Sequence, residues 1–255
     1  MQEKFLPLQY CSLQFEFEIV GNANDAVQGS ANTGDAKSES FLIDDVQIKC
    51  DLVTLDSQLE NEYSGHLLSG KSLPIHFSTF TSSSQVITSI DTHVNVSRSL
   101  TRLKSVYVSL FKPSGAPSYN EVNYFWHPMS GVDYDRSKEL EFQMQIGAKL
   151  FPEMGIRSIA ESFSQLKKAL AIRSSNAQMS MVQRDYRSNK FVIGIGCEKL
   201  SGSSFSGYNS KSGDLLTLKL KPLGNATLVG NCKLHYCLHY DSIMNIRDAG
   251  VEILE

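Results

Sequence analysis

The sequence predicts an all-β protein with an antiparallel jelly-roll β-sandwich fold of about eight or nine strands and one or two short helices in the connections. Apolar and polar residues alternate in many short segments, and clusters of Gly, Pro, Ser and Asn separate these segments. The regular strand and helix alternation of α/β enzymes is not seen. Since a β domain can hold about 250 residues, we expect residues 1–255 to form a single domain.

The N-terminal part is expected to contain two strands joined by a long loop. Residues 13–19, LQFEFEI, alternate apolar with polar side chains, the period of two that places one face of a strand in a core. Residues 45–55, DVQIKCDLVTL, resume this alternation and place Cys50 among the inward-facing positions as a small apolar filler. Residues 21–40 are rich in Gly, Asn, Ser and Asp, which predicts an exposed polar loop.

Two segments have helical signals. Ser57 followed by Glu60 fits a capping box that opens a short helix, and Gly70 is expected to end it. In residues 156–172 the apolar side chains recur every three or four positions, which predicts an amphipathic helix. Ser158, with a glutamate three residues later, is expected to cap its start.

The remaining strands follow the same alternation and are separated by turn residues. We predict them at residues 73–80, 86–97, 103–111, 140–147, 190–196, 214–220 and 226–240. Residues 112–139 are rich in turn residues but also carry aromatic side chains, including Trp126. Such a segment is either a contact surface or a loop held against its own domain by those rings.

Composition and charge argue against several classes of protein. The chain has 24 Lys and Arg against 27 Asp and Glu, a net charge of -3. No Lys/Arg run exceeds two, so direct nucleic-acid binding is not expected. We find no signal peptide and no apolar run near 18 residues, which predicts a protein that is neither secreted nor inserted in a membrane. The five cysteines are scattered without a CxxC pair and are expected to be reduced.

The densest group of metal-binding side chains is Cys232, His235, Cys237 and His239. In a strand, the last three share one face, but alternate strand residues lie roughly 6.5 to 7 Å apart, too far for easy tetrahedral convergence on zinc. The alternating Leu and Tyr residues between them are typical of an ordinary strand. We therefore assign no metal site here.

Two glycine patterns resemble nucleotide-binding motifs. Residues 65–72, GHLLSGKS, match the phosphate-loop pattern, but the motif follows a predicted helix and precedes a strand, the reverse of the order that a phosphate loop needs. Gly194, Gly196 and Gly202 lack dinucleotide-binding spacing and instead suggest a bulge, a turn or a close backbone approach. No catalytic residue and no cofactor are predicted, and the chain is not expected to be an enzyme.

The order of several segments resembles the second, C-terminal jelly roll of double jelly-roll major capsid proteins of eukaryotic DNA viruses and polinton-like elements. The segments that carry the resemblance span most of the chain: residues 5–20, 44–75, 97–111, 141–153 and 236–255. The resemblance implies a structural protein of the virion, three subunits of which form a pseudo-hexagonal capsomer of an icosahedral shell. It implies synthesis in the host cytoplasm or nucleus and no catalytic residues.

One departure from the family concerns length. Its members carry two jelly rolls in tandem, and this chain has room for one. Three explanations stay open: the C-terminal half of a longer capsid protein, with an upstream jelly-roll domain as its partner; a degenerate genomic copy; or a single jelly roll that assembles alone. The polar loop at 21–40 and the aromatic loop at 112–139 are the expected intersubunit contacts. Two alternatives remain open from the residues alone: a jelly-roll module that binds a carbohydrate or receptor, and a cupin-like metal enzyme.

Overall fold

The computed structural model divides the chain into two compact units, one of Ser78–Asp241 with Glu255 and one of Met1–Phe77 with Ser242–Leu254. The residues that the structure describes are 5–19, 40–89, 91–111, 138–172, 181, 185–186, 190–198, 206–211, 215–224 and 232–255. The predicted loops at 21–40 and 112–139 therefore lie almost entirely outside the described residues.

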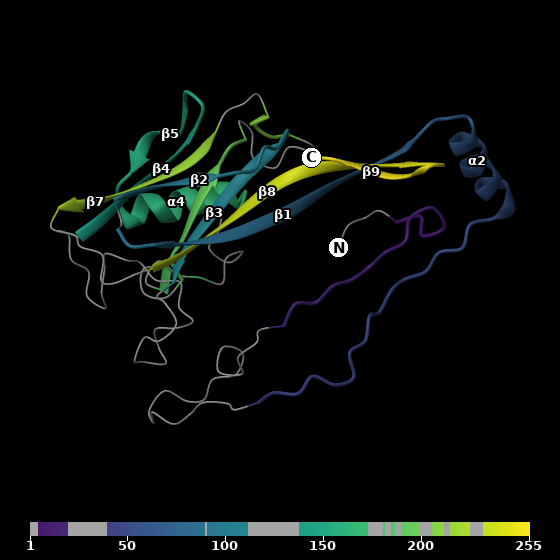
Figure 1. The fold of residues 1–255 in the computed structure, drawn as a ribbon, viewed down its shortest axis with the longest axis horizontal. Coiled ribbons are helices and arrows are strands. Elements are labelled where there is room, and N and C mark those ends of the chain that lie inside the picture. Colours follow the sequence, from purple (N-terminus) through teal and green to yellow (C-terminus); the bar gives the residue numbers. More distant parts are fainter. Residues whose placement is uncertain are drawn as a thin grey trace. The chain divides into compact units, whose positions relative to one another are not determined.

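The larger unit is an antiparallel β-sandwich with the strand order of a jelly roll (Figure 1). Its strands are β1 (Leu73–Ile87), β2 (Thr92–Val96), β3 (Leu103–Phe111), β4 (Lys138–Ile146), β5 (Lys149–Ile156), β6 (Val192–Gly196), β7 (Leu216–Gly224) and β8 (Cys232–Arg247); the part of β1 before Ser78 and the part of β8 after Asp241 belong to the smaller unit. One sheet has the order β1-β8-β3-β6 and the other β2-β7-β4-β5. Strand β1 thus pairs with β8, β2 with β7, β3 with β6 and β4 with β5, the pairing that results when one long hairpin is rolled into two sheets. The predicted jelly roll is confirmed.

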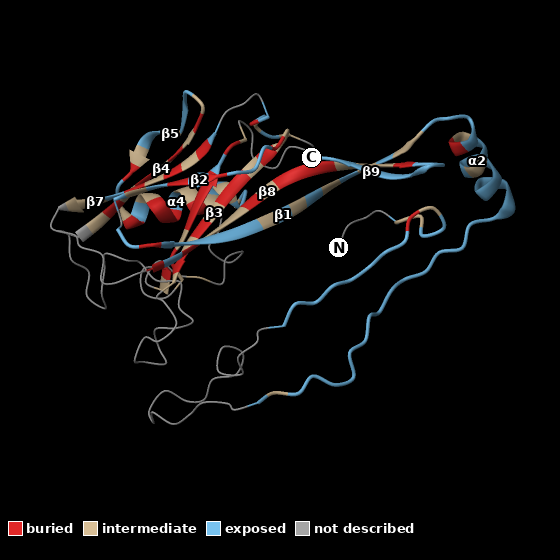
Figure 2. Ribbon diagram, viewed as in Figure 1, coloured by how far each residue is buried: buried red, intermediate tan, exposed pale blue. Residues whose placement is uncertain are grey.

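Alternating side chains fill the space between the two sheets, as the sequence predicted. In β3, Val106, Val108 and Leu110 are buried, and in β7 Leu216 and Leu218 are buried, while the side chains between them are more exposed. Figure 2 shows buried positions on strands of both sheets. The bounds of β3 match the prediction of 103–111, whereas the predicted strand at 86–97 is split between the end of β1 and β2.

Helix α4 (Ile159–Ala169) connects β5 to β6 and confirms the helix predicted at 156–172. The Ser158 hydroxyl accepts a hydrogen bond from the Glu161 amide at 3.1 Å, as the capping pattern predicted. The helix packs closely on β6 at Gly194, where an added Cβ would lie 2.8 Å from Leu166 Cδ1. This close approach is one of the roles predicted for the glycine.

The smaller unit contains the predicted helix α2 (Ser57–Leu68) and an unpredicted strand, β9 (Gly250–Leu254), which pairs with the end of β8. The helix is capped by Asp56, whose carboxylate accepts the Leu59 amide at 2.8 Å, so the prediction that Ser57 is the cap was wrong by one residue. Gly70 follows the helix with a φ of +78°, a conformation that favours glycine and ends the helix as predicted.

The two predicted N-terminal strands are not strands in the structure. Residues 13–19 and 45–55 belong to no sheet and are exposed throughout (Figure 2). Cys50 is therefore exposed, although we predicted it to face a core. Alternation makes a segment able to form a strand, but a strand also needs a neighbouring strand for its hydrogen bonds. Neither segment is paired to another strand in the described part of the chain.

Strand β5 was also absent from the prediction, because Pro152 and Gly155 interrupt its pattern.

Among the described residues, no helix has the length and apolar character needed to cross a membrane.

Candidate functional site

The predicted cluster of cysteines and histidines lies on β8, at the centre of the β1-β8-β3-β6 sheet. Cys232 is buried on the core side of the strand, with Leu234 and Leu238. His235, Cys237 and His239 are on the opposite side, where they lie across from Ser109, Tyr107 and Ser105 of β3. The prediction that the last three share one face is confirmed, and we call this row of side chains the β8 outer stripe.

Each imidazole of the β8 outer stripe contacts a different aromatic ring. His239 stacks on Phe80 of β1 with ring centroids 4.6 Å apart, and its Nδ1 lies 3.2 Å from the Ser105 hydroxyl. His235 meets Phe111 of β3 edge to face at 4.9 Å. Within the described part of the chain, no group of three or more His, Cys, Asp or Glu side chains is arranged to hold a metal ion.

Burial sets the protonation of these groups. It lowers the pKa of His235, assisted by the charge of Lys233, and it lowers the pKa of His239, where Lys104 adds to the effect and Asp241 opposes it. Burial also raises the pKa of the Cys237 thiol. At neutral pH the stripe therefore presents neutral imidazoles and a protonated thiol.

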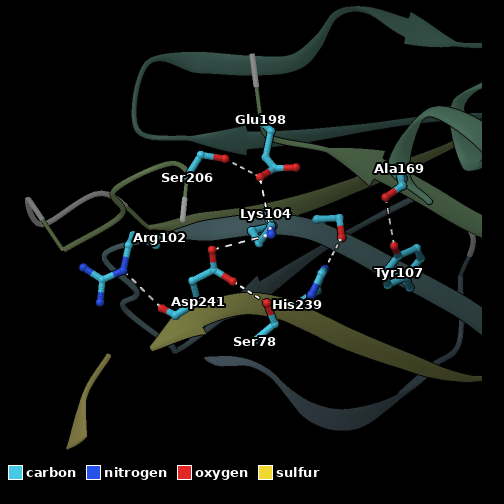
Figure 3. A network of polar contacts seen from close by, with 10 residues as sticks. Ser78, Arg102, Lys104, Tyr107, Ala169, Glu198, Ser206, His239 and Asp241 are labelled. Carbon is cyan, nitrogen blue, oxygen red and sulfur yellow. Dashed lines mark hydrogen bonds and ion pairs between the residues drawn. The ribbon is translucent and has the colours of Figure 1, made fainter. Parts of the chain in front are cut away.

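A buried ion cluster adjoins the stripe (Figure 3). Lys104 Nζ lies 3.5 Å from Asp241 Oδ2 and 3.7 Å from Glu198 Oε1, and the three side chains are 14%, 4% and 9% exposed. The Ser78 hydroxyl donates to Asp241 Oδ1 at 2.5 Å, and the Ser206 hydroxyl donates to Glu198. Each of the two carboxylates thus has a hydroxyl hydrogen-bond donor and the lysine ammonium as partners.

A β-bulge positions the lysine of this cluster. Leu103 lies opposite Tyr240, and Ser105 lies opposite His239, so Lys104 is an extra residue in β3 with no partner position on β8. Such a bulge changes the direction of a side chain. It places Lys104 between the carboxylates of β8 and of the segment after β6, and the cluster ties together β1, β3, β8 and that segment.

Sequence reasoning did not find the ion cluster. Its members are far apart in the chain: the bonded pair Ser78 and Asp241 is separated by 163 residues. The one local signal is Lys104, a charged residue in an otherwise uncharged strand segment, LKSVYVSLF. Which carboxylates meet it depends on the strand order, which the residues near Lys104 do not encode.

The phosphate-loop match at residues 65–72 lies at the C-terminal end of α2 and leads into β1. Its backbone amides are used locally, since Ser69 N donates to the Gly65 carbonyl at 3.1 Å and Gly70 N to the Leu67 carbonyl at 2.9 Å. A helix C-terminus presents carbonyl oxygens and the negative end of the helix dipole, which is unfavourable for a phosphate.

No protein-family model and no curated protein matches this chain.

Proposed function

We propose that the chain is a structural coat-protein domain of a virion, whose work is to associate with copies of itself in trimeric capsomers of an icosahedral shell. The jelly-roll strand order supports this proposal, because viral capsid domains are among the proteins that use this fold. The buried ion cluster is compatible with it, since its groups satisfy one another and brace the sheet.

The observation that carries the proposal is the apolar surface outside the roll. Residues 13–19 and 45–55, which we call arm 1 and arm 2, expose large apolar side chains: Phe17 is 70% and Leu52 80% exposed. Monomeric soluble proteins rarely leave extended apolar surfaces in water, and such surfaces are typical of contacts with other chains. A coat subunit uses contacts of this kind with its neighbours.

Size-exclusion chromatography with multi-angle light scattering, followed by electron microscopy of the same fractions, tests the coat function. We expect discrete trimers or shell-like particles from the purified chain. A protein that stays monomeric over the whole accessible concentration range would contradict the proposal.

A second candidate, a carbohydrate- or receptor-binding module, is favoured by one feature of the β8 outer stripe. Phe80 is 60% exposed while it stacks on His239, and exposed aromatic rings are common in recognition patches. This function predicts a monomer that binds immobilised glycans and loses this binding on Phe80→Ala. The exposed Val86→Ala on the same strand is a matched control.

A further inference from the structure

We propose that Lys104 and Asp241 condense in the folded chain to form an amide bond between Lys104 Nζ and Asp241 Cγ, with Glu198 as the group that transfers the proton. The bond ties β3 to β8 covalently at the centre of the β1-β8-β3-β6 sheet. The inference goes beyond the proposed function and does not depend on it. The contacts, the burial and the fixed positions of the three side chains support it.

The three reacting groups of the ion cluster lie next to one another (Figure 3). Lys104 Nζ is 3.5 Å from Asp241 Oδ2 and 3.7 Å from Glu198 Oε1, so the amine has one carboxylate to attack and another to take its proton. Because Oδ2 is bonded to Cγ, the nitrogen needs only a small movement to reach the carbon that it attacks. Groups held this close react far faster than the same groups free in solution.

The cluster is almost closed to water. The Lys104, Asp241 and Glu198 side chains are 14%, 4% and 9% exposed. In bulk water an ammonium and a carboxylate are separately solvated, and this solvation opposes their condensation. Inside the sheet the ions lose most of it, and their mutual attraction offsets the loss only in part. Conversion of the pair to a neutral amide removes one buried cation and one buried anion, which favours the reaction.

Backbone hydrogen bonds fix the positions of the three residues. The bulge in β3 directs Lys104 toward the carboxylates, and the Lys104 carbonyl accepts a hydrogen bond from the Cys197 amide at 2.8 Å. This bond also fixes the next residue, Glu198. The Asp241 amide donates to the Arg102 carbonyl at 3.1 Å. The backbone on either side of the reacting atoms is therefore held in place before the reaction, as efficient condensation requires.

The reaction balances without any added reagent. Glu198 Oε1 accepts one proton from the Lys104 ammonium, and the freed electron pair of Nζ attacks Asp241 Cγ. The Ser78 hydroxyl, which donates to Asp241 Oδ1 at 2.5 Å, stabilises the negative charge that develops on this oxygen. The Cγ–Oδ2 bond then breaks, and Oδ2 leaves as water with two of the three ammonium protons, one of them returned by Glu198. No atom is oxidised or reduced, and Glu198 ends as a carboxylate.

Mass spectrometry of the intact, purified chain tests the bond. We expect a mass that is lower than that of the sequence by one water molecule. A succinimide at an aspartate removes the same mass, so a tryptic digest has to locate the loss. Because trypsin does not cleave after an acylated lysine, the digest should contain residues 103–112 joined to residues 234–247.

Three variants test the roles of the residues. Lys104→Arg keeps the positive charge but is a poor nucleophile, and it should keep its full mass. Glu198→Gln cannot take up the proton, so the bond should form roughly a hundredfold more slowly. The matched control is Lys190→Arg, because Lys190 Nζ also lies 3.7 Å from a carboxylate oxygen, Asp185 Oδ2, but both side chains are exposed. It should lose one water as the wild-type chain does, and far-UV circular dichroism shows whether each variant is folded.

Each outcome decides part of the inference. A folded wild-type chain that keeps its full mass after prolonged incubation overturns the amide bond and leaves an ion cluster only. A water lost at another position, or lost equally in Lys104→Arg, overturns it as well. Equal rates in Glu198→Gln and the wild-type chain overturn proton transfer by Glu198. Since the bond lies within one chain, its absence leaves the coat proposal standing, and a chain that never assembles leaves the bond standing.

Discussion

At the residue scale, Lys104 is the side chain whose removal should destabilise the fold, because its ammonium pairs with both Asp241 and Glu198. Taking either carboxylate out of water is costly without a nearby positive charge. We expect Lys104→Met to lower the free energy of unfolding by about 3 kcal/mol, measured by urea denaturation at pH 7.

The exposed ion pair of Lys190 with Asp185 provides the control, because its side chains are 43% and 44% exposed. Lys190→Met should cost less than about 1 kcal/mol, as is usual for surface pairs. An equal decrease in the free energy of unfolding in the two variants would show that the buried cluster does not stabilise the sheet.

The histidines of the β8 outer stripe predict a pH dependence. Burial lowers the folded-state pKa of His235 and His239, so the unfolded chain binds more protons than the folded chain once the pH falls below about 6.5, the ordinary histidine pKa. Stability should be fully present above this pH and should be lost as the pH falls toward the lowered pKa values.

Urea denaturation at pH 7.5, 6.5 and 5.5 measures this slope. The double variant His235→Gln and His239→Gln should flatten it, and each single variant should remove part of it. A slope that is unchanged in the double variant would assign the pH dependence to other groups.

At the scale of elements, the contact of α4 with β6 depends on the lack of a side chain at Gly194. A Cβ there would lie 2.8 Å from Leu166 Cδ1 and 2.9 Å from Leu166 Cα, so the helix backbone would have to move. We expect Gly194→Ala to destabilise the fold by about 2 kcal/mol in thermal or urea unfolding.

Gly196 is the matched control on the same strand. An added Cβ there would have its nearest neighbour, Ala169 Cα, at 3.8 Å, an ordinary contact. Gly196→Ala should therefore change stability by less than about 0.5 kcal/mol. A loss at residue 196 as large as that at residue 194 would mean that helix packing is not the cause.

The start of α2 provides a second comparison. Asp56 accepts the Leu59 amide, whereas Ser57 is the first residue of the helix. We expect Asp56→Ala to cost the helix about 1 kcal/mol and Ser57→Ala much less. Hydrogen exchange of the peptide covering residues 57–68 measures the loss of helix stability in each variant. Equal losses would contradict the assignment of Asp56 as the cap.

The elements show what local sequence can and cannot predict. Strand β3 was predicted at its observed bounds because its alternation is regular from Val106 to Phe111 and both of its neighbours lie in the same chain. Arm 1 has an equally clear pattern, but its pattern does not reveal whether a neighbouring strand exists. The alternation on β8 predicted correctly that its two histidines share one face. The ion cluster was not predicted, because the bulge at Lys104 and the distant carboxylates depend on register and strand order.

At the scale of the whole molecule, the rolled hairpin pairs strands that are far apart in the chain. Strand β1 meets β8, and β2 meets β7. Distant contacts cost loop-closure entropy before they contribute stability, and folds rich in them fold slowly.

We expect the chain to refold in milliseconds to seconds, not in microseconds, when stopped-flow circular dichroism follows the β signal after dilution from urea. The Gly194→Ala variant, refolded in parallel, shows whether the contact of α4 forms before or after the slow step. Refolding that is complete within about 0.1 millisecond would contradict this expectation.

Because β1 pairs with β8, the chain enters and leaves the roll at neighbouring positions, and Ser78 and Asp241 are joined there by a hydrogen bond of 2.5 Å. A short linker between these two positions would join the two ends of the Ser78–Asp241 segment that forms the larger unit. The roll should therefore accept circular permutation, with new termini between β7 and β8, and should be transferable as an insert into a surface loop of another protein.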